Sequence, residues 1–298
     1  MIKKKAITVD LLTFDPRARS SSPALYAHEI VERVCCAWDS GADLVLLPEF
    51  TWMGLEPLIV GKGEEPLKTV AKVFWNQLFP EIQQQLSRAQ KAVVLGTVPA
   101  LTESGAIRNR APIFSNGTFF YQEKLHLTPW EDSFEPGDSL KIWTFGNFRI
   151  AVIICLDIEI PELSARLRNA KVDLVLCPSA TETILGVERV NRCASARAVE
   201  LGCYVGVSHL TGTADSALID CSLGCAALYS PSQSAFGDTI RRAETPIYES
   251  GNETLRVSID KNLLDAARRM RVETNPANLG QKAAGIDRFI RIESNFLT

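Results

Sequence analysis

The sequence has no surplus of basic residues and no long apolar run. Its 32 lysines and arginines are outnumbered by 35 aspartates and glutamates, which gives a formal net charge of -3. A chain without a basic excess is not expected to bind nucleic acid or an anionic lipid surface. Lys3–Lys5 form a short basic start, but Asp10 interrupts the apolar stretch that follows. The sequence therefore predicts neither a signal peptide nor a membrane span.

Cysteine and histidine do not occur in the spacings of metal sites or disulfide frameworks. There is no Cys-x-x-Cys, and the three histidines, His28, His126 and His209, lie far apart. Most of the eight cysteines sit inside apolar runs, which is typical of free thiols in a core. We therefore expect no zinc site and a reducing, cytoplasmic location.

The chain also lacks an internal repeat, a low-complexity tract and a linker that would separate two domains. Its 298 residues, 46% of them hydrophobic, suit one large α/β domain. We expect a single domain over residues 1–298. Residues 274–298 show little periodicity, and we expect them to form a tail that contacts another subunit.

What the sequence does contain is an alternation of apolar strands and amphipathic helices. Apolar runs predict strands over residues 6–12, 43–47, 92–98, 150–154, 172–177, 203–208, 225–229 and 255–259. Helical periodicity predicts helices over residues 23–39, 66–90 (broken at Pro80) and 184–201, with a loop over 51–65. Residues 113–123 predict a hairpin that turns at Ser115-Asn116-Gly117. We therefore expect a layered α/β fold with mixed sheets.

Three reactive side chains follow apolar runs in this pattern. Glu49 comes after the run at 43–47, Lys124 leaves the second strand of the hairpin, and Cys155 follows Ile150–Ile154. Each has an ordinary alternative, because a loop glutamate or lysine is usually solvated and a cysteine is often a small core residue. Strands of one sheet can bring such side chains to a common edge, where open α/β folds bind ligands.

These residue types together suit nucleophilic attack on an acyl group. A thiolate is a nucleophile that needs a neighbouring base or cation to form near neutral pH. A carboxylate can take the thiol proton and return it to a leaving amine. A fixed ammonium can stabilise the oxyanion of a tetrahedral intermediate, together with a backbone N–H after the cysteine.

Three motifs resemble the signatures of the nitrilase superfamily of carbon–nitrogen hydrolases. They are Leu-Pro-Glu-Phe at 47–50, Glu-Lys-Leu-His-Leu-x-Pro-x-Glu at 123–131 and Ile-Cys-x-Asp-x-x-x-Pro-Glu-Leu at 154–163. The supporting matches are Asn109, Ala196-Arg197-Ala198-x-Glu200, and Asp260 with Arg268. The three motifs stand in the family's order, so the chain is similar to the family over most of its length.

The resemblance implies an α/β fold in the form of a four-layer αββα sandwich with two mixed sheets. It implies no metal or organic cofactor and assembly into a homodimer or a higher homo-oligomer. Cys155 would be the nucleophile, Glu49 the general base and Lys124 the oxyanion-stabilising lysine. Glu131 would position the substrate or Lys124, and the amide N–H of Leu156 would be a second oxyanion donor.

The residues after the nucleophile bear on the substrate. Cys155-Leu156-Asp157 keeps the aspartate of many amidase-like members, whereas true nitrilases typically show Cys-Trp-Glu. We therefore expect hydrolysis of a small linear amide of ω-amide or N-carbamoyl type, with Leu156, Trp130 and Asp157 at the substrate site. The alternatives are a nitrilase and a catalytically silent member that acts as a binding module. His209 stands where many members carry asparagine, and the sequence assigns it no role.

Overall fold

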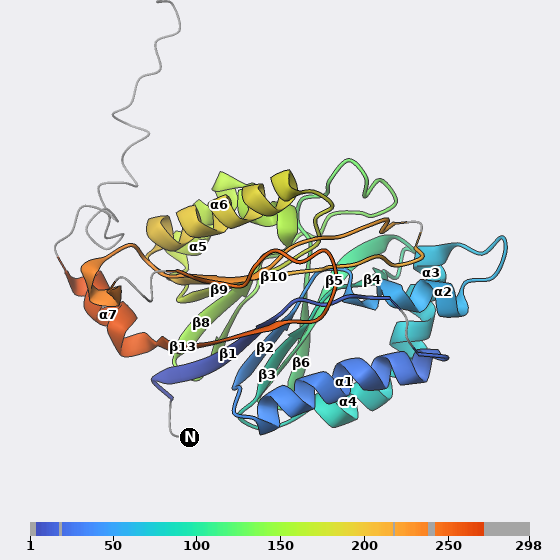
Figure 1. The fold of residues 1–298 in the computed structure, drawn as a ribbon, viewed down its shortest axis with the longest axis horizontal. Helices are drawn as coiled ribbons and strands as arrows, with labels where there is room; N and C mark the ends of the chain where they lie inside the picture. The colour runs from blue at the N-terminus through green and yellow to red at the C-terminus, as the bar shows by residue number, and fades with distance from the viewer. Residues whose placement is uncertain (1–3, 18–19, 217, 238–241, 271–298) are drawn as a thin grey trace, which may run out of the picture.

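The computed structural model describes residues 4–17, 20–216, 218–237 and 242–270. The tail expected at residues 274–298 lies outside the described residues. The described chain forms two mixed β-sheets that pack face to face, and helices cover both outer faces (Figure 1). The predicted four-layer αββα architecture is therefore confirmed.

The first sheet contains both the first and the last described strand. Its strands are β1 (Ala6–Leu12), β2 (Leu44–Leu47), β3 (Ala92–Leu95), β4 (Val98–Leu101), β5 (Ile107–Ser115), β6 (Thr118–Glu123) and β13 (Thr254–Asp260). Their order is β13-β1-β2-β3-β5-β4, and β6 pairs with β5. The β1–β2 and β2–β3 pairs are parallel, whereas β13 and β5 join the sheet antiparallel. A helix between each parallel pair explains this pattern, because a parallel strand needs a crossover connection.

The second sheet repeats the same design. Its strands are β7 (Ile142–Phe145), β8 (Phe148–Val152), β9 (Leu174–Ser179), β10 (Tyr204–His209), β11 (Ala226–Tyr229) and β12 (Arg242–Glu244). Their order is β12-β11-β10-β9-β8-β7. The β8–β9 and β9–β10 pairs are parallel, and the outer pairs are antiparallel.

The helices cover the sheets in two outer layers (Figure 1). The first sheet is covered by α1 (Pro23–Asp39) and α4 (Phe79–Leu86), and the second by α5 (Pro161–Asn169) and α6 (Ile184–Leu201). The shorter helices α2 (Glu56–Ile59) and α3 (Pro66–Val73) lie at one end of the sandwich, and α7 (Lys261–Arg269) lies at the other.

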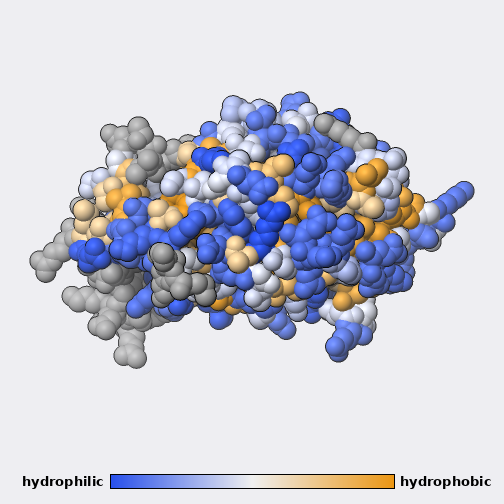
Figure 2. Space-filling model, turned by 90° about the horizontal axis from the view of Figure 1, so that it is seen from below, coloured by the Kyte–Doolittle hydropathy of each residue, from blue (hydrophilic) through white to orange (hydrophobic). Residues whose placement is uncertain are grey.

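Helix α1 shows why these sequences become covering helices. It starts at Pro23, which suits the first turn, and the Ser22 side chain caps it by accepting from the Leu25 N–H. Its apolar stripe, which includes Ile30, Val34 and Trp38, is buried against the sheet. The opposite stripe faces solvent. Figure 2 shows this side of the molecule, where hydrophilic residues surround smaller apolar patches. No helix in the described ranges is both long and apolar enough to cross a bilayer.

The two sheets meet in a common apolar core. Alternation along β1 points Ile7, Val9 and Leu11 into this core, where they are at most 1% exposed. Gly206 of β10 lies opposite, and a Cβ atom there would lie 2.9 Å from a methyl carbon of Leu11. The missing side chain at Gly206 thus lets the sheets approach closely at this point.

Several boundaries differ from those predicted. The strand predicted at 92–98 is two strands, because Gly96 has a φ of +67° and turns the chain against the Pro48 carbonyl. The helix predicted at 66–90 ends at Leu86, and it is interrupted by a π-helical turn at Phe74–Leu78, before Pro80. The expected loop at 51–65 contains the 3-10 helix Thr51–Leu55 as well as α2.

The hairpin and the second sheet also extend beyond the prediction. Strand β5 begins at Ile107, so that Asn109 lies inside the hairpin and not ahead of it. Strand β7 at Ile142–Phe145 was not predicted, because only Phe145 of its four residues is buried. The remaining predicted strands and the helix over 184–201 agree with the structure within a few residues.

Candidate active site

The structure brings together the side chains predicted to be catalytic. Glu49 follows β2, Lys124 follows β6, and Cys155 follows β8 after two intervening residues. Lys124 Nζ donates to Glu49 Oε1 at 2.8 Å and to Glu131 Oε2 at 2.7 Å. Glu49 and Lys124 are 1% exposed and Glu131 is 3% exposed. Strand ends from both sheets therefore contribute to one buried site.

Cys155 lies at a sharp turn between β8 and the 3-10 helix Cys155–Glu159. Its φ of +47° falls in the left-handed region, which is unfavourable for a residue with a side chain. The Cys155 Sγ donates to the Ala180 carbonyl at 3.5 Å, and the Ala180 N–H donates to Glu49 Oε2 at 3.1 Å. Ala180 thus connects the thiol to one carboxylate oxygen of Glu49.

Two residues that sequence reasoning left without a role complete the cluster. Asn109 Nδ2 donates to Glu49 Oε1 at 2.9 Å and to Glu131 Oε1 at 3.2 Å. The Thr128 N–H and hydroxyl donate to Glu131 Oε2 at 2.9 and 3.0 Å. The signals in the sequence are weak: a polar residue on the inward side of β5, and a threonine three positions before a glutamate, as in a capping box.

The buried cluster has more negative than positive charge. It contains the carboxylates of Glu49 and Glu131 but only one ammonium, on Lys124. Burial raises the pKa of Glu49 to about 7, although Lys124 acts in the opposite direction. Burial disfavours the ammonium, but the nearby Glu49, Cys155 and Glu131 raise the pKa of Lys124 above its ordinary value. Lys124 is therefore charged at neutral pH, whereas Glu49 titrates close to it.

The Cys155 thiol is protonated in the resting state. Burial, and then the negative charge of Glu49, raise its pKa well above the ordinary value. The thiol is in turn among the influences that lower the pKa of Glu49. The thiol can therefore act as a nucleophile only if its proton is transferred during attack, and Glu49 is the carboxylate placed to accept it.

Asp157 does not reach the cavity in which Cys155 lies. Its carboxylate accepts from the backbone N–H groups of Leu125 and His126 at 3.1 and 2.8 Å, and His126 Nδ1 lies 2.9 Å from it. It also accepts from the Ile154 N–H at 3.4 Å. The structure thus places Asp157 as a link between the segment after Lys124 and the turn at Cys155.

Leu156 and Trp130, the other predicted substrate-binding residues, do line the cavity. This inner cavity has a volume of about 290 Å³ and also exposes Glu49, Lys124, Glu131 and Cys155. The sequence did not predict the part of the wall formed by Leu218, Ile219, Cys221 and Ser222, which lies in turn-rich sequence without a motif, or the part formed by Glu159, which lies opposite Arg189. Arg189 Nε lies 3.4 Å from Glu159 Oε2.

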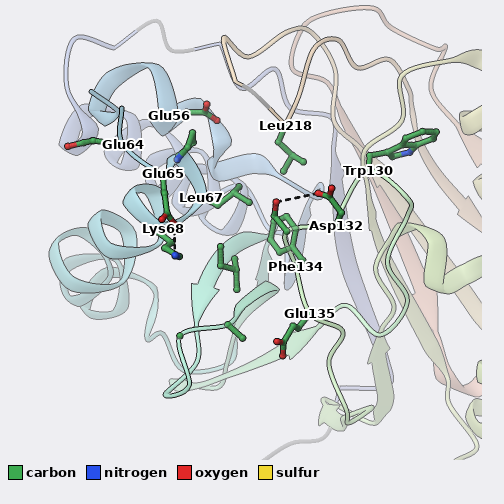
Figure 3. A pocket seen from close by; sticks show the side chains of 15 residues that line it. Glu56, Glu64, Glu65, Leu67, Lys68, Trp130, Asp132, Phe134, Glu135 and Leu218 are labelled. Carbon is green, nitrogen blue, oxygen red and sulfur yellow. Dashed lines mark hydrogen bonds and ion pairs between the residues drawn. The ribbon is translucent and has the colours of Figure 1, made fainter. Parts of the chain in front are cut away.

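A second, larger cavity lies beside the inner one. This outer cavity has a volume of about 760 Å³ and shares Trp130 and Leu218 with the inner cavity. Figure 3 shows Glu56, Glu64 and Glu65 on one side of it and Asp132, Phe134 and Glu135 on the other. Five carboxylate side chains and one lysine, Lys68, line this cavity, so its wall is acidic.

His209 lies at the end of β10, outside both cavities. Its Nδ1 is 2.8 Å from the Cys225 carbonyl, and burial lowers the pKa of the imidazole to about 4. The ring is therefore neutral at physiological pH. In the part of the chain that the structure describes, no group of three or more His, Cys, Asp or Glu side chains is arranged to hold a metal ion.

Sequence comparison gives one family and two relatives. The family model of the carbon–nitrogen hydrolases matches residues 18–269. An (R)-stereoselective amidase from a Pseudomonas species is 28% identical over 239 residues, which cover 78% of both chains. A probable hydrolase from Bacillus subtilis is 28% identical over 192 residues, which cover 63% of this chain. The match spans only 37% of that longer protein.

Solved structures give a consistent fold. Nit3 of Saccharomyces cerevisiae, a member of branch 10 of the nitrilase superfamily, matches with a TM-score of 0.69 and 20% identity over 92% of this chain and 97% of its own. The NitFhit protein of Caenorhabditis elegans matches with a TM-score of 0.71 and 18% identity, over 94% and 66%. An amidase from Nesterenkonia sp. AN1 matches with a TM-score of 0.65 and 16% identity, over 95% and 100%. At these identities the likeness shows a shared fold.

Proposed function

The chain belongs to the carbon–nitrogen hydrolase family, and from this premise we propose that it hydrolyses a non-peptide C–N bond in a small linear amide. The substrate is of ω-amide or N-carbamoyl type, and the reaction passes through a thioester on Cys155. It releases ammonia or an amine and then a carboxylic acid. The observation that carries the proposal is the contact of a buried thiol with Ala180, which in turn donates to Glu49, beside a charged lysine.

In the first half-reaction, Cys155 Sγ attacks the carbonyl carbon of the amide while its proton passes to Glu49. The carbonyl oxygen becomes an oxyanion, and the Lys124 ammonium stabilises it. Two of the three Lys124 N–H bonds are directed at Glu49 and Glu131, which leaves the third for the oxyanion. The Leu156 N–H is the second donor. The C–N bond then breaks, Glu49 returns the proton to the leaving nitrogen, and a thioester remains.

In the second half-reaction, water attacks the thioester. Glu49 takes a proton from this water, and the same two donors stabilise the second oxyanion. The C–S bond breaks, the acid is released, and the Cys155 sulfur recovers its proton from Glu49. Glu131 takes no proton in this scheme. Its contacts with Lys124, Asn109 and Thr128 hold the ammonium in place.

Two similar proteins support the choice of an amide. One relative is named an (R)-stereoselective amidase, and the structural neighbour from Nesterenkonia sp. AN1 is an amidase whose active-site cysteine carries a Michael adduct of acrylamide. Asp157 after the nucleophile points the same way. The inner cavity of about 290 Å³ suits a small acyl group.

A panel of amides, N-carbamoyl compounds and nitriles tests the proposal through ammonia release. We expect turnover of amides or N-carbamoyl compounds. Ammonia from nitriles alone would support the nitrilase alternative, and silence over a broad panel would support the binding module. Because the outer cavity is acidic, an ω-amide or N-carbamoyl compound whose far end is a carboxylate should react more slowly than the same compound with that carboxylate esterified. Added salt should narrow that difference, since it screens the charges.

The proposal also predicts the pH dependence of kcat/KM. Glu49 must be ionised to accept the thiol proton, and its pKa is raised to about 7. We therefore expect kcat/KM to fall about tenfold for each pH unit below about 7. A profile measured with one neutral amide checks this. A flat profile down to about pH 5, close to the ordinary pKa of glutamate, would contradict the role of Glu49.

We also propose that the chain, as a single carbon–nitrogen hydrolase domain over residues 1–298, forms a homodimer or a larger homo-oligomer. Residues 274–298 would contact a partner subunit. The resemblance to the nitrilase superfamily supports this, as do Ile184 and Leu185 at the start of α6, which are 51% and 72% exposed. Light scattering should give at least twice the mass of one chain, whereas a monomer at working concentrations would contradict assembly.

A further inference from the structure

One neutral residue contacts all the charged members of the catalytic cluster. Asn109 lies in β5, and its side chain is 1% exposed. Its Nδ2 donates to Glu49 Oε1 at 2.9 Å and to Glu131 Oε1 at 3.2 Å. Its backbone carbonyl accepts from the Lys124 N–H at 2.9 Å. The sequence resemblance includes Asn109 as a match but gives it no part in the reaction.

The orientation of the Asn109 amide follows from the charges around it. Its two side-chain neighbours are carboxylate oxygens, which accept hydrogen bonds but cannot donate them when ionised. The NH₂ group must therefore face them, because the reverse orientation would set an amide oxygen against two carboxylates. As a result, Asn109 Oδ1 is buried and has no hydrogen-bond partner among the described residues. A buried acceptor without a partner disfavours folding, so stability does not explain why an asparagine stands here. Its two N–H bonds to the carboxylates of Glu49 and Glu131 do.

We propose that Asn109 is a positioning residue that fixes which oxygen of Glu49 takes the proton from Cys155. This inference rests on the proposed function. Glu49 Oε1 accepts from both Lys124 Nζ and Asn109 Nδ2. Glu49 Oε2 instead accepts from the Ala180 N–H, and the Ala180 carbonyl accepts from the Cys155 thiol. Oε1 is occupied by two donors, whereas Oε2 contacts the same residue as the thiol, so we assign Oε2 as the base.

An asparagine serves this purpose because it adds two donors and no charge. A lysine or arginine at 109 would cancel the excess negative charge of Glu49 and Glu131, and an aspartate would add to it while losing the donors. Hydrogen bonds to a carboxylate favour its ionised form. The Asn109 N–H bond to Glu49 Oε1 therefore favours the ionised base and acts against burial, which raises the pKa of Glu49.

The test compares Asn109→Leu with a matched variant, Asn191→Leu. Asn191 is also buried, at 6% exposed, and its Oδ1 also lacks a partner among the described residues. Its Nδ2 donates to the Cys225 thiol at 3.3 Å and not to a carboxylate. In both variants leucine keeps a similar volume and removes the amide. The readout is the rate of Cys155 alkylation by iodoacetamide against pH, followed by peptide mass spectrometry, which requires no known substrate.

We expect the rate of Cys155 alkylation in the parent protein to fall as the pH drops below about 7, because Glu49 becomes protonated. This fall is the acid limb of the pH profile. In Asn109→Leu this acid limb should move up by about one pH unit, and the plateau rate should fall about tenfold. In Asn191→Leu the limb should stay where it is in the parent. If Asn109→Leu does not fold, Asn109→Ser provides the same test, with a smaller shift because the hydroxyl can still donate one hydrogen bond.

The outcomes separate this inference from the proposed function. A normal acid limb in the parent together with an unmoved limb in a folded Asn109 variant would overturn the role of Asn109 alone. A shift of the same size in Asn191→Leu would also overturn it, because the effect would then be general to buried amides. A parent in which Cys155 alkylation shows no acid limb would overturn the proposed function and this inference together.

Discussion

Cys155→Ala is expected to lower ammonia release from the best amide substrate by at least about 10⁴-fold. The thiol forms the covalent bond to the acyl group, and no other side chain in the scheme can replace it. The substitution removes one side-chain hydrogen bond, to the Ala180 carbonyl. Thermal stability should therefore change little. The measurement is steady-state ammonia release by the parent and by the variant, each with its melting temperature.

Cys203→Ala is the matched control for this prediction. Cys203 is a fully buried thiol that lies just before β10 and lines neither cavity. Its replacement leaves a small cavity in the core, which should cost about 1 kcal/mol of stability and leave kcat/KM nearly unchanged. Ammonia release by Cys155→Ala at a rate near that of the parent would remove the nucleophile from the mechanism.

Glu49→Gln is expected to lower kcat/KM by about 10³-fold, because glutamine cannot accept the thiol proton. The same substitution should change how stability depends on pH. Glu49 has a raised pKa of about 7 in the folded protein, against 4.5 for the ordinary group. Its contribution to stability is therefore fully present below about 4.5 and is lost as the pH rises through about 7.

Glutamine does not titrate, so it has no such loss. The free energy of unfolding of Glu49→Gln, relative to the parent, should therefore increase as the pH is raised from about 5 to about 8. Urea unfolding of both proteins across this range measures the difference. A difference that stays constant or decreases with pH would show that the Glu49 pKa is not raised in the folded state.

The sequence predicts the charged members of the site better than it predicts what holds them. Glu49, Lys124 and Cys155 follow strands whose apolar runs are visible in the sequence, and a sheet edge brings strand ends together. Asn109 and Ala180 could not be assigned in this way. The Ala180 contact depends on how the first sheet faces the second, and the Asn109 contact depends on the order of strands within the first sheet; no local pattern encodes either.

The elements of the fold were likewise predicted where local sequence determines them and not where distant residues do. The helix over Pro23–Asp39 was predicted with its boundaries, because its cap, its first-turn proline and its apolar stripe are all local. The strand expected at 92–98 was wrong as one piece, because Gly96 turns the chain where it meets the Pro48 carbonyl, far away in the sequence. Strand β7 was not predicted because three of its four residues are not buried, so it shows no apolar run. Its pairing with β8 is what makes it a strand.

The thioester on Cys155 can be detected by trapping the acyl-enzyme. The protein is mixed with a substrate from the panel, quenched in acid during turnover, digested and analysed by mass spectrometry. The mass of the substrate's acyl group should appear on the peptide that contains Cys155, and hydroxylamine should remove it, as it does from a thioester. Turnover with no acyl group on Cys155, or an acyl group on another residue that forms as fast as turnover, would rule out Cys155 as the nucleophile.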